Sequence, residues 1–248
     1  MPGLDWLTAQ PVAHRGLHDA VSGAIENTAS AFRAAIKAGF AIETDLQLSG
    51  DGEAMVHHDF ALGRLTLGSR QLAAMTASGL KAVPFKATAD RMMTLGEMCG
   101  FVAGRAPMLI ELKSRFDGDL RLVRRAAAVL ESYAGPFAVM SFDPEPIIAL
   151  RALAPAFTRG IVAERTYKDS EWRTLTAKQK RSLAFLLHAQ RSRPHFIAYQ
   201  VNDLPSPGPW IARNLFGRPL LTWTVRTDAE RARARRRADQ MIFEGFRP

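Results

Sequence analysis

Two carboxylates alternate with apolar or uncharged residues in the segment Ile42-Glu43-Thr44-Asp45-Leu46. Residues two apart in a β-strand lie on the same face, so this spacing predicts that Glu43 and Asp45 point the same way. Burying such a pair without a cation is costly, because each charge loses its hydration and repels the other. Two interpretations follow: a metal-binding pair inside a barrel, or an exposed pair that forms salt bridges.

A third carboxylate occurs in the segment Ile110-Glu111-Leu112-Lys113. The same strand spacing places Glu111 and Lys113 on one face, as a further ligand and a cation directed at the same site. A ligand set made of carboxylate oxygens favours Mg²⁺, Ca²⁺ or Mn²⁺ over zinc, whose sites usually recruit Cys or His.

Histidines follow two of the expected extended segments, in His14-Arg15-Gly16 and in His57-His58-Asp59. A single histidine is more often a packed or surface residue than a catalytic one. Two histidines beside an acidic cluster could instead serve as a general acid and a general base. Arg15 adds a guanidinium that could bind a phosphate through two hydrogen bonds.

These residues require a scaffold that gathers strand ends at one place. Short apolar runs alternate with longer segments of helical periodicity, and this alternation predicts βαβ units with a parallel sheet. Helices are expected at Thr28–Ala38, Asp117–Glu131 and Asp143–Leu153, entered through Asp or Thr caps. Eight strands and a length of 248 residues predict a (β/α)8 TIM barrel. The strands are expected near Pro11–His14, Ala41–Leu46, Met108–Leu112, Phe137–Ser141, Thr158–Val162, Phe196–Gln200, Pro219–Thr224 and Gln240–Phe243.

Two irregularities are expected in this barrel, which we interpret as a single domain over residues 1–248. After the second strand, the stretch from Glu53 to Ala89 contains an extra extended piece, Ala54–His57, and is predicted to be a small insertion over one rim. The sequence printed here ends at Pro248, soon after the eighth strand, which leaves no eighth outer helix. A second copy of the chain could cover this seam, so a homo-oligomer is allowed.

The ordered set of motifs resembles the glycerophosphodiester phosphodiesterase family, and the resemblance extends over nearly the whole chain. Each motif alone is weak, but their order and spacing are specific. The segments are Ala13-His14-Arg15-Gly16, Glu26-Asn27-Thr28, Ile42-Glu43-Thr44-Asp45, Val56-His57-His58-Asp59, Ile110-Glu111-Leu112-Lys113, Leu62-Gly63-Arg64-Leu65-Thr66, Ser141-Phe142-Asp143-Pro144 and Trp223-Thr224-Val225.

The resemblance implies a metal-dependent barrel enzyme that cleaves glycerophosphodiesters into glycerol 3-phosphate and an alcohol. It implies that a glycerol hydroxyl attacks phosphorus first, giving a cyclic phosphate that water then opens. Carried over to this chain, it assigns the divalent metal to Glu43, Asp45 and Glu111, the acid and base to His14 and His58, phosphate binding to Arg15 and Lys113, and the pocket wall to Trp223.

The chain departs from the family pattern at three places around the expected pocket. The stretch Leu17–Ile25 is longer than expected and has Ile25 where a proline is usual. Arg226 replaces the asparagine that usually follows Trp-Thr-Val, and Phe243-Glu244 stands where the last strand usually ends in Thr-Asp. These changes bear on the choice of substrate more than on the reaction.

The chain carries 33 Lys and Arg against 24 Asp and Glu, a net charge of +9. This excess favours an anionic partner, and a small phosphodiester substrate fits best. The basic run from Arg231 to Arg237 lacks interleaved aromatics and is interpreted as a solvated helix face, so no nucleic-acid partner is expected.

Cellular location is also predicted by the sequence. No apolar run approaches the roughly 18 residues of a membrane span, so stable membrane insertion is not expected. Residues 1–10 do not resemble a secretory signal, and the single cysteine, Cys99, permits no intrachain disulfide. A cytoplasmic protein is therefore predicted.

Two alternative functions compete with the hydrolysis of glycerophosphodiesters. A lysophospholipase D-type hydrolase on the same barrel would require a lipid surface for activity. A catalytically silent barrel would only bind phosphorylated ligands or nucleic acid, and steep salt-dependent DNA binding would support it.

Overall fold

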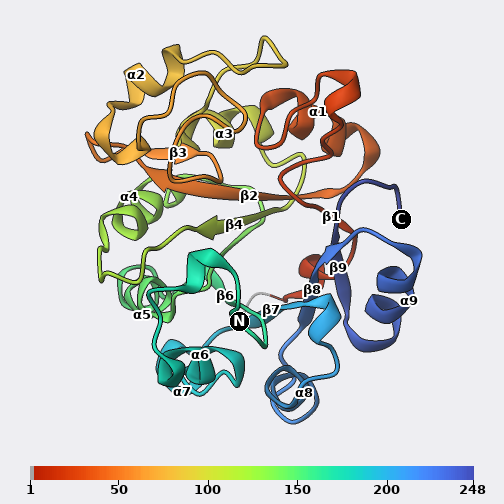
Figure 1. Cartoon of the computed structure of the whole chain (residues 1–248). Helices are drawn as coiled ribbons and strands as arrows, with labels where there is room; N and C mark the ends of the chain where they lie inside the picture. Colours follow the sequence, from red (N-terminus) through yellow and green to blue (C-terminus); the bar gives the residue numbers. More distant parts are fainter. Residues whose placement is uncertain (1–2) are drawn as a thin grey trace.

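The computed structural model of the protein describes residues 3–248, apart from the side chain of Glu171. Eight parallel strands close into a barrel, because β1 pairs with both β2 and the last strand, β9 (Figure 1). The predicted (β/α)8 barrel is confirmed, and each expected strand is present. The strands are β1 (Val12–Ala13), β2 (Ala41–Leu48), β4 (Met108–Leu112), β5 (Phe137–Ser141), β6 (Thr158–Ala163), β7 (Phe196–Gln200), β8 (Leu220–Val225) and β9 (Gln240–Phe243).

The barrel interior is packed with alternate strand residues. Leu109, Met140, Val162 and Leu221 form one buried cluster, and Leu7 of the short helix η1 (Asp5–Leu7) belongs to it. Their strand neighbours face outward and pack against the helices, as Ile110 does beside α3 and α4 residues. The apolar residues thus fill the barrel below its mouth, where the functional side chains of such barrels lie.

An outer layer of helices surrounds the strands (Figure 1). The helix expected from Asp117 begins only at Arg121, because Gly118 adopts a left-handed φ of 77° that a helix cannot include. Asp143 does cap its helix, whereas the Thr28 hydroxyl donates to Ile25 instead. The helices are α1 (Ala29–Ala38), α3 (Leu95–Val102), α4 (Arg121–Leu130), α5 (Pro144–Leu153), α6 (Ala177–Ala184), α7 (Ala189–Ser192), α8 (Pro207–Asn214) and α9 (Asp228–Arg237).

The excursion after β2 forms a small layer of its own. It contains β3 (Ala54–Val56), which pairs antiparallel with β2, then η3 (Leu72–Ala74) and α2 (Ala77–Ala82). A separate apolar cluster, including Met55, Leu80 and Ile25, stabilises it. Ile25 therefore contributes to packing where a proline would bury less apolar surface.

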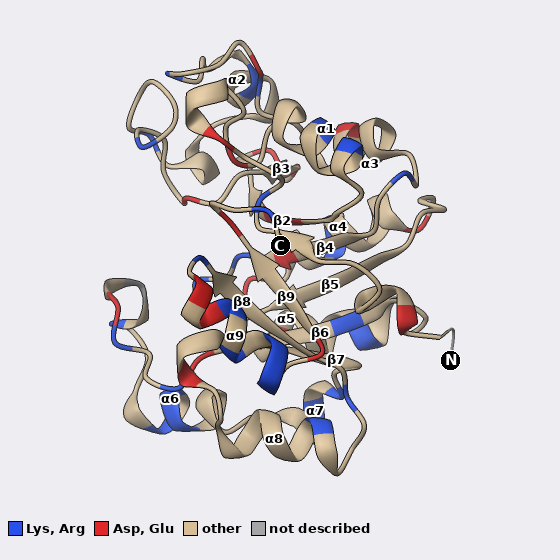
Figure 2. Cartoon of the chain, turned by 90° about the vertical axis from the view of Figure 1, so that its right-hand side faces the viewer, with Lys and Arg blue, Asp and Glu red and all other residues tan. Residues whose placement is uncertain are grey.

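The arginine run and the end of the chain can be compared with their predictions. The arginine run lies on α9, where Arg235, Arg236 and Arg237 are exposed, as predicted for a solvated face (Figure 2). Within the described part of the chain, no helix follows β9. Among the helices of residues 3–248, none has both the length and the apolar character needed to cross a bilayer.

Candidate active site

The three predicted carboxylates meet where the middle of β2 lies beside the carboxyl end of β4. Asp45 and Glu111 are register partners on these adjacent parallel strands, and Glu43 precedes Asp45 by one strand repeat. One oxygen from each of Glu43, Asp45 and Glu111 lies within 4.8 Å of the others, and all three residues are buried. The prediction that they share one face is therefore confirmed, and the exposed salt-bridge interpretation is wrong.

Lys113 lies between two of these carboxylates. Its Nζ atom is 2.8 Å from Oδ1 of Asp45 and 2.6 Å from Oε1 of Glu111. Burial alone would raise the pKa of Asp45, but Lys113 and Arg15 outweigh this effect and hold that pKa well below its usual range. Asp45 is thus an ionised carboxylate in the protein interior.

Glu43 is in a different electrostatic position. Burial raises its pKa well above the usual range, and the nearby charges of Asp45 and Glu111 raise it further. It accepts a hydrogen bond of 2.9 Å from the backbone nitrogen of Arg15. Burial, only partly offset by Lys113, likewise raises the pKa of Glu111. The neighbouring cations therefore do not fully stabilise the ionised forms of Glu43 and Glu111. A divalent cation would do so, and the oxygen donors of the cluster suit Mg²⁺, Ca²⁺ or Mn²⁺.

The turn after β1 holds Asp45 from the opposite side. Arg15 and Gly16 have left-handed φ values of 56° and 81°, and a Cβ on Gly16 would approach that of Ala31 to 2.9 Å, so only glycine fits there. This turn places Nε of Arg15 3.3 Å from Oδ2 of Asp45 and its Nη1 2.7 Å from Oε1 of Glu26. Arg15 therefore binds carboxylates, and its guanidinium is fixed beside the cluster of Glu43, Asp45 and Glu111.

Asn27 is a supporting residue for which the sequence analysis gave no role. Its amide nitrogen donates to Oδ2 of Asp45 at 2.9 Å, and its amide oxygen accepts from the hydroxyl of Thr44 at 2.8 Å. Both contacts are buried. Asn27 has a left-handed φ of 58°, which asparagine adopts more readily than most residues. This conformation is visible only in the structure, so the sequence did not point to its role.

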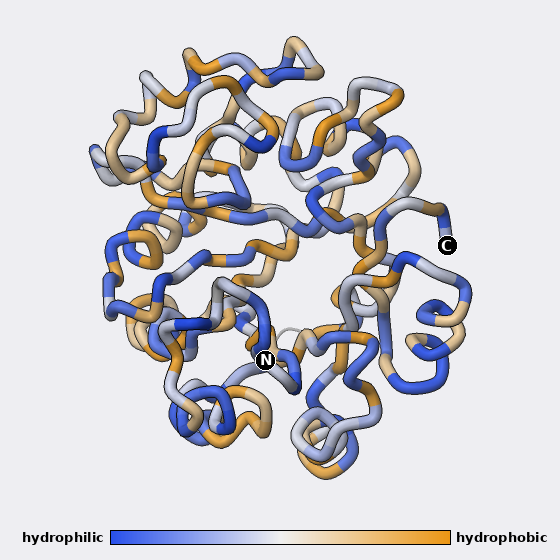
Figure 3. Tube along the Cα trace, viewed as in Figure 1, coloured by the Kyte–Doolittle hydropathy of each residue, from blue (hydrophilic) through white to orange (hydrophobic). Residues whose placement is uncertain are grey.

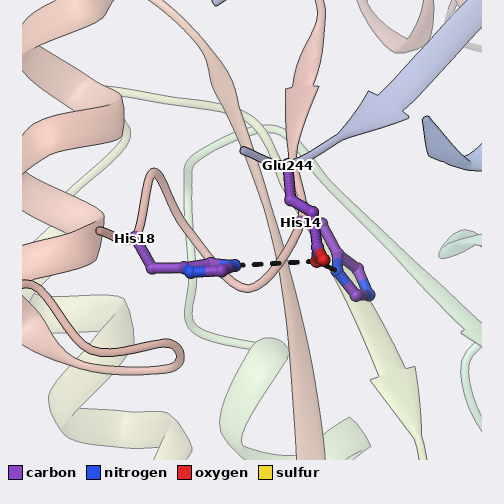
Figure 4. A group of neighbouring side chains, drawn as sticks. All are labelled: His14, His18 and Glu244. Atoms are coloured by element: carbon purple, nitrogen blue, oxygen red, sulfur yellow. Dashed lines mark hydrogen bonds and ion pairs between the residues drawn. The ribbon is translucent and has the colours of Figure 1, made fainter. Parts of the chain in front are cut away.

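His14 is held by a residue from the other end of the chain. Its Nδ1 atom lies 2.5 Å from Oε2 of Glu244, which also lies 3.6 Å from Nε2 of His18 (Figure 4). Oε1 of Glu244 is 2.5 Å from Nε of Arg226. Burial would raise the pKa of Glu244, but its contacts with His14 and His18 lower it far below the usual range. Glu244 is therefore ionised and can only accept, so His14 donates from Nδ1 and keeps Nε2 for a ligand.

The two neighbouring histidines differ in environment. His57 is buried, and burial lowers its pKa to about 4, so it is neutral at physiological pH. His58 lines the cavity and is partly exposed, with its Nδ1 atom 2.8 Å from Oδ1 of Asp59. Asp59 is bound in turn by Arg64, whose Nε donates to Oδ2 at 2.7 Å. Of the two, His58 is the one that can contact a ligand.

A cavity of about 470 Å³ opens at the carboxyl ends of the barrel strands. The predicted residues His14, Arg15, Glu43, His58, Glu111, Lys113 and Trp223 line it, while Asp45 is buried beneath. Trp223 packs edge-on against Phe142 with ring centroids 5.4 Å apart, and Phe142 packs against Trp172 at 4.8 Å. The cavity thus has a charged side and an aromatic wall. The sequence analysis placed Trp223 in this wall but not Phe142 or Trp172.

Comparisons with known proteins agree with this geometry. The model of the glycerophosphoryl diester phosphodiesterase family matches residues 14–245. A search of curated proteins gave no match.

Solved structures share the fold at low sequence identity. An Oleispira antarctica phosphodiesterase, solved in complex with the product sn-glycerol-3-phosphate, has a TM-score of 0.77 and 19% identity over 96% of this chain and 94% of its own. A glycerophosphodiester phosphodiesterase from Thermotoga maritima has a TM-score of 0.70 and 23% identity over 94% of each chain. A Silicibacter pomeroyi protein, described as a putative glycerophosphoryl diester phosphodiesterase, has a TM-score of 0.74 and 21% identity over 94% of this chain and 88% of its own.

The family match covers nearly the whole barrel, from the histidine at the end of β1 to the glycine after Glu244. On that basis the chain belongs to the glycerophosphoryl diester phosphodiesterase family and is a phosphoric diester hydrolase.

Proposed function

We propose that this enzyme hydrolyses glycerophosphodiesters to glycerol 3-phosphate and an alcohol, using a divalent ion held by Glu43, Asp45 and Glu111. The observation that carries the proposal is the meeting of these three buried carboxylates with His14 and His58 at one cavity. The glycerol 3-phosphate bound by the Oleispira antarctica neighbour supports the same product here.

The charged side of the cavity would neutralise the substrate phosphate. A phosphodiester resists attack because of its own negative charge, which grows on the phosphate oxygens in the transition state. When bound, the metal ion would supply Lewis-acid stabilisation of that charge. We assign a supporting role to Lys113 and Arg15, which are pre-positioned beside the cluster by their carboxylate partners and need no reorganisation.

The hydrogen-bond partners of the histidines suit them to opposite roles. Burial lowers the pKa of His14, although its contact with Glu244 opposes this, so His14 is neutral and its Nε2 can accept a proton. We assign His14 as the base that deprotonates the attacking hydroxyl. His58, held at Nδ1 by Asp59, is assigned as the acid that protonates the departing alkoxide.

We propose that the attacking hydroxyl belongs to the glycerol moiety. Its oxygen would bond to phosphorus while the bond from phosphorus to the alcohol breaks, giving a cyclic glycerol phosphate. Water would then open this ring, with His14 returning its proton to the glycerol oxygen and His58 accepting one from water. The cyclic phosphate, offered as a substrate, should be hydrolysed to glycerol 3-phosphate, and complete resistance to it would favour direct attack by water.

The test of the activity is release of glycerol 3-phosphate from glycerophosphocholine and glycerophosphoethanolamine by the purified protein. EDTA should abolish release, and Mg²⁺, Mn²⁺ or Ca²⁺ should restore it. A folded protein that releases nothing with any of these ions contradicts the proposal. Activity confined to lysophospholipids in micelles or vesicles would instead support the lysophospholipase D-type alternative.

We place the enzyme in the cytoplasm as a further part of the proposal. Cys99 is buried and unpaired, as suits a reducing compartment.

A further inference from the structure

The outer surface around α8 concentrates exposed apolar side chains. Nine large apolar residues are exposed among those the structure describes, and six of them come from two short segments, residues 185–187 and 210–216. These six side chains are 40% to 69% exposed, so much of their apolar surface does not pack against the barrel. We call them the α8 patch: Phe185, Leu187, Trp210, Ile211, Leu215 and Phe216.

The two segments form one continuous surface. A groove of about 650 Å³ runs between them, lined by Phe185, Ile211 and Phe216. The first turn of α8 lies directly on the other segment, because a Cβ on Gly208 would come 3.1 Å from the carbonyl group of Phe185. Leu215 caps the C-terminus of α8 in a helical conformation, four residues after Ile211, so the two side chains lie on one face. The patch is therefore a joint surface of both segments.

The surroundings of the α8 patch are strongly basic. Residues 173–218 contain eight lysines and arginines but a single acidic residue, Asp203. Two of the eight, Arg191 and Arg213, pair with carboxylates outside this range. Arg193 and Arg218 line the groove itself, and neither forms a salt bridge with any side chain that the structure describes. Figure 2 shows α6, α7 and α8 together along one edge of the molecule, with basic residues on α6 and α7. Figure 3 shows apolar residues on α8.

Charge decides between the two kinds of partner that could cover such a surface. A two-fold dimer would bury the same basic surface of both copies against each other, so the positive charges around the patch, Arg193 and Arg218 among them, would repel. An anionic bilayer would attract the basic groups while accepting exposed Trp and Phe side chains at its interface. The combination of apolar side chains with a basic surround is the one that interfacial membrane segments use.

The position of the patch determines how the barrel would sit. Pro194 and Arg218 line the groove just before β7 and β8 begin, whereas the active-site cavity opens where the strands end. We propose that the α8 patch docks this protein peripherally on an anionic phospholipid surface, with the mouth of the barrel at the far end from the lipid. The docked enzyme would then take water-soluble diesters from solution.

The test is co-sedimentation of the full chain with vesicles. Vesicles of phosphatidylcholine alone are compared with vesicles containing about one-third phosphatidylglycerol, at low and high salt. Two double variants probe the patch: Leu215→Ser with Phe216→Ser, and Arg193→Glu with Arg218→Glu. Control variants make changes of the same kind elsewhere. The apolar control is Leu67→Ser with Leu153→Ser, two leucines that are both 52% exposed, and the charge control is Arg235→Glu with Arg236→Glu on α9.

The expected result is salt-sensitive binding of the wild type to the anionic vesicles only. Each patch variant should lower the partition coefficient by about tenfold or more, and each control by less than about threefold. Hydrolysis of a soluble diester without vesicles should be unchanged in the patch variants, so docking and the proposed reaction are tested separately.

Three results would overturn the proposal. The first is equal binding of the wild type to both vesicle types. The second is a loss in the α9 control as large as that in the patch variants, which would show general charge attraction alone. The third is a wild-type dimer in sedimentation velocity that the patch variants make monomeric, without vesicle binding, which would assign the patch to self-association.

Discussion

The Nδ1 atom of His14 lies 2.5 Å from Oε2 of Glu244, although the two residues are 230 positions apart in the chain. His14 follows β1 and Glu244 follows β9, and closure of the barrel makes these strands neighbours. The backbone confirms the contact, since the nitrogen of His14 donates to the carbonyl of Phe243 at 2.9 Å. The strand pairing that closes the fold thus also orients a cavity histidine.

We predict that Glu244→Gln lowers kcat by about tenfold or more while leaving KM nearly unchanged. A neutral amide no longer requires His14 to donate from Nδ1, so the ring loses its fixed orientation and tautomer, which supply part of the acid–base contribution. Steady-state kinetics on glycerophosphocholine measure both constants. His18→Asn is the control, because His18 contacts Glu244 without touching His14, and an equal loss in both variants would contradict the specific role of this pair.

We predict that His14→Ala and His58→Ala each lower turnover by about a hundredfold or more, the share expected of a general acid or base. Both side chains line the cavity and are partly exposed, so circular dichroism and thermal melting should show a folded protein. His195→Ala provides a matched control because His195 does not line the active-site cavity. Full activity in either cavity variant would remove that histidine from the reaction.

We predict that Glu43→Gln has opposite effects on the metal-free and the metal-loaded enzyme. Without metal, burial and the repulsion from Asp45 and Glu111 disfavour the Glu43 carboxylate, so the neutral amide should raise the melting temperature in EDTA by about 2–4 °C. With Mn²⁺, the variant should lose most of the stabilisation that the wild type gains. Differential scanning fluorimetry measures both effects, and a lower melting temperature in EDTA would show that Glu43 is not under repulsion.

We predict an acid-sensitive contribution to stability from Glu26. Burial would raise its pKa, but hydrogen bonds and ion pairs with Arg64 and Arg15 lower it to about 2, against an ordinary value of 4.5. Because the folded-state pKa is lowered, the stabilisation is fully present above about pH 4.5 and is lost as pH falls towards 2, up to about 3 kcal/mol.

Urea unfolding of the wild type and Glu26→Gln as a function of pH tests this contribution. The gap between their free energies of unfolding should be largest at neutral pH and should narrow through the window from about 4.5 to 2. Glu97→Gln serves as the control, since Glu97 pairs with Lys81 at an exposed position and should give a much smaller gap. A gap that does not change with pH would contradict the ion-pair origin.

The sequence by itself determined the features that depend on local chain geometry. Alternation along β2 and β4 requires Glu43 and Asp45, and likewise Glu111 and Lys113, to share faces, whatever surrounds the strands. The alternation of short apolar runs with helical segments predicted the eight strands, and an extra extended piece predicted the insertion after β2. Local rules were weaker at helix starts, where the left-handed Gly118 delayed α4 to Arg121.

Only the tertiary structure decided which distant residues meet. The sequence analysis recorded Phe243-Glu244 and Arg226 as departures from a pattern, but it could not show that Glu244 holds His14 and Arg226. It did not join Phe142 and Trp172 to the wall begun by Trp223, or the two segments of the α8 patch to each other. These contacts depend on closure of the barrel and on helix packing around it, which bring together side chains whose separation along the chain carries no periodic signal.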